Sequence, residues 1–299
     1  MSFRELFTRP PLAFLMAERG YEEADWVLLG VPLDITSTFR PGSRMGPTEI
    51  RRASLGLEIV ALPGHLDTSA LSIHDAGDLH VSGDPGETLD RLARVVAEVI
   101  ADGKHLAVVG GEHTITLGVA SGLRKATGEL PRVVCLDAHL DMRDEFLGQR
   151  LCHATVCRRL VELLGPERLA IVGVRACSPE GLEFAERNDL LVITAQQARE
   201  EGPSGVLSAL KSLLAQEGLL HISVDLDVLD PAFAPAVQTP EPYGLTPWEL
   251  RELLLGLCEH GPVSVDLVEL APGYDHGQTA LLAARLLADI MCAVGKRQA

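Results

Sequence analysis

The chain has 299 residues, of which 46% are hydrophobic, so it is long enough to bury a large core within one domain. Its formal net charge of −16 argues against nucleic-acid partners, which need a basic surface. That charge suits a small cationic partner, or simply an acidic soluble surface. The six cysteines form no C-x-x-C pair, which indicates reduced thiols in a cytoplasmic protein. We therefore expect a single domain over residues 1–299, with residues 1–24 as an N-terminal arm.

The N-terminal residues do not fit a secretory signal. The apolar stretch from Leu12 to Ala17 is short and is flanked by Pro10, Pro11 and Glu18. No apolar run reaches the length expected of a membrane-spanning helix. We expect a cytoplasmic location and no membrane partner.

Short apolar runs alternate with amphipathic stretches along the chain, which predicts a parallel β-sheet flanked by helices. These runs are Trp26 to Val31, His105 to Val109, Arg132 to Leu136, Leu169 to Val174, Leu190 to Thr194, Leu219 to Leu226 and Pro262 to Val268.

Two helix starts can be read from the sequence. The segments 84–87 and 246–249 each combine a capping side chain, a proline in the first turn and a glutamate at the third helical position. They predict helices over 85–101 and 247–259. The longest irregular segment, 230–245, is rich in proline, and long loops in compact domains are often functional.

Four of the apolar runs end in a polar cluster. The clusters are VVGGEHT (108–114), VVCLDAHLD (133–141), ISVDLDVLDP (222–231) and VDLVELAP (265–272). In an open parallel sheet, the carboxyl ends of the strands form the edge where ligands bind. The sequence therefore places these polar side chains together at one edge.

Alternate residues carry the acids and histidines of two clusters, at 137, 139 and 141 and at 225 and 227. An extended backbone would point each set to one side. Gathered carboxylates repel one another and lose hydration, so they need a compensating cation. Imidazole and carboxylate ligands without cysteine favour Mn²⁺ over structural Zn²⁺, and Co²⁺, Ni²⁺ and Fe²⁺ also fit.

Each cluster alone has a simpler interpretation. Gly110 to His113 could be an ordinary connection after a strand. The segment 225–231 could be a calcium-like acidic loop or a capped strand end. The combination of clusters at corresponding strand ends favours a metal site.

The four clusters resemble, in order and spacing, the signatures of the ureohydrolase family, which includes arginases and agmatinases. The resemblance also covers Gly30 to Pro32 and the segment FRPGSRMGP (39–47). It implies an α/β fold, a three-layer αβα sandwich with a mainly parallel eight-stranded sheet, and a homotrimer or homohexamer. It also implies two Mn²⁺ ions per subunit, one held by His113, Asp137, Asp141 and Asp225, and the other by Asp137, His139, Asp225 and Asp227.

The resemblance further implies urea-releasing chemistry at these residues. Two metal ions can share a water and lower its pKa, which supplies a nucleophile for a guanidinium carbon. The departing amine must be protonated, and the family assigns the first proton transfer to Asp141. His153 resembles the histidine that shuttles protons in agmatinases. Glu269 resembles the carboxylate that binds the guanidinium.

The substrate is expected to be a guanidinoalkylamine. The segment MRDEFLGQRLCH (142–153) lacks the polar residues with which arginases bind the amino-acid end of arginine, and Ser178 stands where arginases have an aspartate. Agmatine is the first expectation, followed by aminopropylagmatine, guanidinobutyrate or another guanidino compound. Asp144 and Glu145 could attract a distal ammonium or could be solvated loop acids.

One loop departs from the family pattern. Ala236 stands where relatives generally have glycine, and Gln238 where they have a small residue, which would matter if position 236 needs a positive φ. Two other functions stay open from the sequence. These are a non-catalytic metal-binding relative and a one-zinc amidohydrolase of the deacetylase type.

Overall fold

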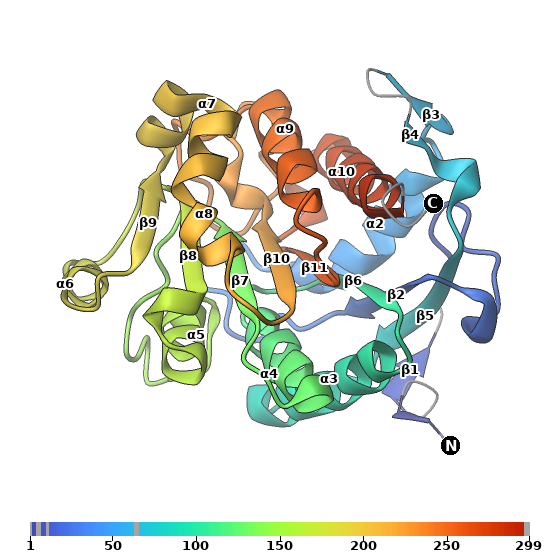
Figure 1. Cartoon of the computed structure of the whole chain (residues 1–299), viewed down its shortest axis with the longest axis horizontal. Coiled ribbons are helices and arrows are strands. Elements are labelled where there is room, and N and C mark those ends of the chain that lie inside the picture. Colours follow the sequence, from blue (N-terminus) through green and yellow to red (C-terminus); the bar gives the residue numbers. More distant parts are fainter. Residues whose placement is uncertain (1, 4–6, 10–11, 63–65, 296–299) are drawn as a thin grey trace.

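The computed structural model describes residues 2–3, 7–9, 12–62 and 66–295, and there the chain forms a nine-stranded sheet between two layers of helices (Figure 1). Eight strands are parallel, and the two-residue β1 (Thr8–Arg9) pairs antiparallel with one edge. The parallel strands, in spatial order, are β5 (Ile73–Leu79), β2 (Trp26–Val31), β6 (His105–Gly110), β11 (Ser264–Val268), β10 (Leu220–Asp225), β7 (Arg132–Leu136), β8 (Leu169–Val174) and β9 (Leu191–Thr194). The predicted three-layer fold is confirmed.

Helices cover both faces of the sheet, as Figure 1 shows. One layer contains α3 (Pro85–Ala101), α4 (Ile115–Thr127) and α5 (Val156–Leu164). The other contains α2 (Gly46–Ser54), α7 (Ala195–Ala209), α9 (Pro247–Cys258) and α10 (Gln278–Gly295). The remaining elements are peripheral: α6 (Pro179–Arg187) beside β9, the short α8 (Lys211–Leu214), and a separate antiparallel pair of β3 (Val60–Ala61) and β4 (Leu66–Asp67).

The two predicted helix starts are in place, but only one forms the full capping box. At α9 the Thr246 hydroxyl accepts from the Glu249 amide, and the Glu249 carboxylate accepts from the Thr246 amide. At α3 the Asp84 side chain accepts from the Gly86 amide, whereas Glu87 instead binds Ser82 and Arg91. A competing arginine one turn along the helix explains the difference.

Strand β5 was missed by the apolar pattern because its sequence, IHDAGDL, carries two acids. Both acids contact Arg51 of α2, which is fully buried: its guanidinium lies 2.8 Å from the Asp75 carboxylate and 2.6 Å from that of Asp78. The strand lies next to β2, where Gly30 leaves the space, since a Cβ there would lie 1.9 Å from Asp78 Oδ1. A buried ion pair thus replaces the apolar side chains that mark the other strands.

Helix α10 is long and apolar enough to cross a membrane, with a mean hydropathy of 1.4 over 18 residues, so the expectation that no apolar run reaches this length was wrong. In this fold 67% of that stretch is buried inside the protein. Its contacts with α2 and α9 explain its apolar composition as that of a core helix.

Candidate metal centre and substrate pocket

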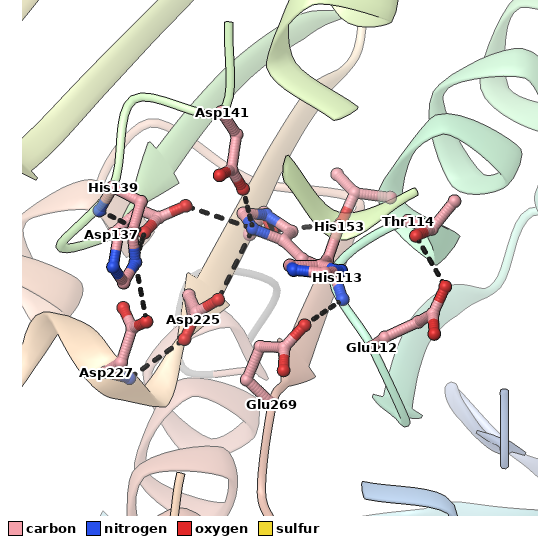
Figure 2. Close-up of polar contacts among 12 residues, drawn as sticks. Glu112, His113, Thr114, Asp137, His139, Asp141, His153, Asp225, Asp227 and Glu269 are labelled. Carbon is pink, nitrogen blue, oxygen red and sulfur yellow. Dashed lines mark hydrogen bonds and ion pairs between the residues drawn. The ribbon is translucent and has the colours of Figure 1, made fainter. Parts of the chain in front are cut away.

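The four polar clusters lie at the carboxyl ends of neighbouring strands. Strands β6, β11, β10 and β7 are consecutive in the sheet, so their ends meet at one edge. His113 follows β6, Asp137 follows β7, Asp225 ends β10, and Glu269 follows β11. The predicted gathering of these side chains is confirmed (Figure 2).

The first group of candidate metal ligands surrounds His113. Its Nδ1 lies 3.0 Å from an oxygen of Asp137 and 3.4 Å from oxygens of Asp141 and Asp225. Its Nε2 lies 3.1 Å from the buried hydroxyl of Ser223, which fixes the ring from behind. His113, Asp137 and Asp141 could hold a metal ion together.

The second group surrounds His139. Its Nδ1 lies 2.9 Å from Asp227 Oδ2 and 3.6 Å from Asp137 Oδ1. Asp137, His139 and Asp227 could hold a second ion, so Asp137 belongs to both groups. Asp225 belongs to neither of these two groups, although its side chain lies between them in Figure 2.

The expected extended backbone does not produce this arrangement. Asp225 and Asp227 come together through a 3-10 turn (Leu226–Val228), where the Asp225 side chain accepts from the Asp227 amide at 2.9 Å. Asp141 has a φ of 46°, the left-handed region that costs a non-glycine residue free energy. The polar residues thus lie in turns at or just after the strand ends. In such a turn, a carboxylate oxygen that accepts a hydrogen bond from a backbone amide is held more rigidly than a side chain on a free strand.

The pKa values of the cluster reflect charges crowded out of water. Burial, and then the charges of Asp227, Asp137 and Glu269, raise the pKa of Asp225 well above its usual range. Burial lowers the pKa of His139, but Asp227 and Asp137 outweigh it and raise that pKa to about 12. The protein alone therefore retains protons here, and divalent ions can replace them.

Unpaired atoms at the centre fit a metal. Within the described residues, His113 Nδ1 and Asp137 Oδ2 are buried and form no hydrogen bond of good geometry, although they face each other at 3.0 Å. Buried polar atoms without a well-formed hydrogen bond are costly, and a cation bound by both would satisfy them. This donor set of imidazole nitrogens and carboxylate oxygens, without sulfur, fits divalent Mn, Fe, Co or Ni.

Glu269 lies beside the cluster but has a different environment. Its φ is 69°, its Oε1 accepts from the His113 amide at 2.6 Å, and its buried Oε2 has no hydrogen-bond partner among the described residues. Burial raises its pKa well above the usual range. It thus has one oxygen fixed and one oxygen left for a donor that enters the pocket (Figure 2).

A cavity of about 280 Å³ opens on this edge, at the small end for a ligand pocket. His139, Asp141, His153, Asp225 and Glu269 all line it, so it joins the predicted catalytic residues to the metal ligands. Ser178 also lines it, but its hydroxyl accepts from the Gly181 amide and caps α6.

The expected acids for a distal ammonium lie elsewhere. Neither Asp144 nor Glu145 is among the lining residues, and Asp144 lies 2.6 Å from Arg159, which also lowers its pKa. The lining instead includes Glu241, which lies 4.0 Å from His139, and Arg143. Glu241 belongs to the long loop 230–245. The length of that loop was the only feature of the sequence that indicated a functional role for this residue.

Arg175 was also missed; it does not line the pocket itself, but it holds the backbone of Glu241, which lies at the rim. Its guanidinium donates to backbone carbonyls of Asp227, Leu229 and Glu241, and of other residues on the same loop. Asp227 and Glu241 are therefore positioned by one side chain. No local pattern marks an arginine that binds carbonyl groups distant in sequence.

Position 236 adopts no strained backbone, whereas the buried Gln238 is only partly satisfied, because its Oε1 has no hydrogen-bond partner among the described residues. Ala236 does not have a positive φ, so its side chain meets no strain there. Gln238 is buried, and its amide donates to the Ser43 hydroxyl, which ties the loop to the segment after β2.

Comparison with known proteins agrees with this geometry. The model of the arginase family matches residues 24–293. The agmatinase of Bacillus subtilis is 34% identical, over 93% of this chain and 94% of that protein. The N(1)-aminopropylagmatine ureohydrolase of Thermococcus kodakarensis is 36% identical over 96% of both. The crystal structure of an agmatine ureohydrolase of Thermoplasma volcanium superimposes with a TM-score of 0.88, at 35% identity, over 99% of this chain and 97% of that one.

The fold is a three-layer αβα sandwich with candidate metal ligands at the carboxyl edge of its sheet, and the relatives define the protein as a hydrolase. The chain belongs to the arginase family, the ureohydrolases that include arginases and agmatinases. The resemblance read from the four motifs is thus confirmed.

Proposed function

We propose that this protein hydrolyses agmatine, or a close guanidinoalkylamine, to urea and a primary amine, with two Mn²⁺ ions per subunit. The observation that carries the proposal is Glu269, whose unpaired buried oxygen lines the cavity beside both candidate metal groups. A planar guanidinium offers the paired N–H donors that such a carboxylate binds. The names of the relatives support the same substrate class.

The ions would be held by two overlapping sets of side chains. One set is His113, Asp137, Asp141 and Asp225; the other is Asp137, His139, Asp225 and Asp227. Bound divalent ions supply Lewis-acid activation of water at neutral pH. Asp137 and Asp225 would be shared between the sets; the presence of Asp137 in both candidate groups and the 3.4 Å between Asp225 and His113 support this assignment.

The protein's own side chains then handle binding and proton transfer. Glu269 binds and orients the guanidinium, so that its carbon faces the metal groups. Asp141 gives a proton to the departing amine, which is a poor leaving group until protonated. His153, which lines the same cavity and is only 8% exposed, exchanges protons with solvent.

The tail of the substrate is less constrained than its guanidinium. Glu241 favours an ammonium, which agmatine carries. A guanidino acid is a second candidate, because Arg143 lines the same cavity and stacks 4.9 Å from the Phe146 ring, without an ion pair in the described part of the chain. A free guanidinium at a pocket wall suits a carboxylate.

The test is urea release by the Mn²⁺-loaded protein from agmatine, aminopropylagmatine, 4-guanidinobutyrate and arginine. We expect the highest kcat/KM for agmatine and the lowest for arginine. A higher kcat/KM for 4-guanidinobutyrate than for agmatine would indicate that Arg143 binds the carboxylate at the tail of the substrate. No urea from any of the four would overturn the proposal, and one tightly held zinc per chain would favour an amidohydrolase instead.

The assembly can be tested on the same preparation. We propose a homotrimer or homohexamer, which the family membership supports. Sedimentation velocity should give a mass of three or six chains of 32.1 kDa, and a monomer would contradict it.

A further inference from the structure

A buried carboxylate outside the metal groups is connected to His153. Glu112 is fully buried and accepts four hydrogen bonds: from the amides of Ile35 and Thr36 at 2.9 and 2.8 Å, and from the hydroxyls of Thr36 and Thr114, each at 2.8 Å. Figure 2 shows the bond from Thr114. A carboxylate has no proton to donate, so all four partners must be donors.

The Thr36 hydroxyl connects this carboxylate to the His153 ring. Its oxygen lies 2.8 Å from Glu112 Oε1, 3.1 Å from His153 Nδ1 and 3.3 Å from the His153 backbone nitrogen. A hydroxyl has a single proton, and the charged carboxylate binds it more strongly than a neutral ring nitrogen does. The hydroxyl oxygen is therefore the acceptor for His153, and Nδ1 must carry a hydrogen.

The other ring nitrogen faces the pocket. His153 Nε2 lies 3.5 Å from the hydroxyl of Thr38, and both residues line the cavity. The tautomer of a neutral histidine is set by the hydrogen bond that its inner nitrogen makes. With Nδ1 protonated, the lone pair of Nε2 is available on the side where substrate binds.

We propose that Thr36 and Glu112 are positioning residues that hold neutral His153 in the Nδ1–H tautomer, so that its proton exchange with substrate takes place only at Nε2. Nε2 takes a proton from solvent and becomes N–H, and the imidazolium then donates that proton to the amine product, after Asp141 has supplied the first proton. Nδ1 keeps its own proton throughout, so the ring returns to its starting form. Only the use of this proton rests on the proposed ureohydrolase activity; the tautomer does not.

The tautomer can be measured without any turnover. Histidine labelled with ¹⁵N reports which ring nitrogen carries the proton, and loading with diamagnetic Mg²⁺ or Zn²⁺ keeps the spectrum sharp. His153→Asn identifies the signals. We expect wild-type His153 to be neutral with the proton on Nδ1 at high pH, and the proton to move to Nε2 or to divide between both nitrogens in Thr36→Val. Nε2–H in the wild type would overturn the inference.

Kinetics provide the second measurement. Thr36→Val should lower kcat for the best guanidino substrate on the order of 10-fold or more, with KM within about twofold, because a well-placed acid–base group contributes about 100-fold or more. Thr36→Ser restores the hydroxyl and should restore both kcat and the tautomer. Thr114→Val is the matched control: it removes another hydroxyl from Glu112 without touching His153, so the Nδ1–H tautomer should remain.

These outcomes separate the two proposals. Absence of urea from every substrate, with the Nδ1–H tautomer intact, would defeat the proposed function alone. Wild-type kcat in Thr36→Val, or a tautomer that Thr114→Val changes as much as Thr36→Val does, would defeat the positioning role of Thr36.

Discussion

Two of the regions that take acids into the protein interior neutralise their charge differently. Between α2 and β5, Arg51 binds Asp75 with two parallel contacts of 2.8 Å and Asp78 with one of 2.6 Å. At the carboxyl edge of the sheet, the five acids of the site have two histidines beside them and form no ion pair with lysine or arginine within the described residues. Those acids are Asp137, Asp141, Asp225, Asp227 and Glu269.

The difference separates a structural acid cluster from a functional one. The first cluster contains its own cation, so it is complete when the chain folds. The second depends on cations from outside, which explains both the unpaired atoms at its centre and the raised pKa of Asp225, where burial and neighbouring acids act together. Each of the following substitutions tests one side of this comparison.

Arg51→Met should have the largest effect. It leaves the buried carboxylate of Asp75 and the partly buried one of Asp78 without their cation, so we expect the free energy of unfolding to fall by about 3–5 kcal/mol, measured by chemical denaturation. Arg52→Met is the matched control on the same helix, because the Arg52 side chain is 65% exposed and its loss should change stability by about 0.5 kcal/mol or less. Equal losses in the two variants would show that the buried pair does not stabilise the fold.

Asp225→Asn should lower the metal content of the protein. A bridging ligand loses its charge, so we expect fewer than two ions per chain by elemental analysis and a fall in urea release of more than about 100-fold. Asp230→Asn, five residues further on, changes a carboxylate that accepts only loop amides and should retain both ions. Retention of both ions and full activity in Asp225→Asn would exclude a bridging role.

Glu269→Gln should have a smaller and more selective effect. Because Glu269 belongs to neither candidate metal group, both ions should stay bound while kcat/KM falls on the order of 10-fold to 100-fold. Glu241→Gln is the matched control at the other end of the pocket: it should change the order of preference among substrates rather than the rate for all. Loss of metal from the Glu269→Gln variant would indicate that Glu269 is a metal ligand.

Most of the sheet could be predicted because its strands are buried on both faces. β2, β7 and β8 begin and end at the residues read from their apolar runs. β5 is the outermost parallel strand of the same sheet and carries Asp75 and Asp78, and only the distant Arg51 makes these acids compatible with burial. A strand stabilised by an ion pair from another element leaves no local pattern.

The candidate site divides in the same way. His113, Asp137, His139, Asp141, Asp225 and Asp227 stand in motifs whose spacing points to one edge, and the structure brings them together. Thr36, Arg175 and Glu241 could not be found in this manner, because their partners lie far away in sequence. The candidate ligands could therefore be predicted from the sequence, whereas the residues that surround and position them could not.

The carbonyl contacts of Arg175 have a consequence for how the pocket moves. The same guanidinium holds the backbone at the candidate ligand Asp227 and at the rim residue Glu241. Opening the rim by local unfolding would therefore break bonds that also place a metal ligand. The rim and the metal edge should exchange their amide hydrogens as one cooperative unit, so substrate would enter a rigid pocket instead of passing an independent lid.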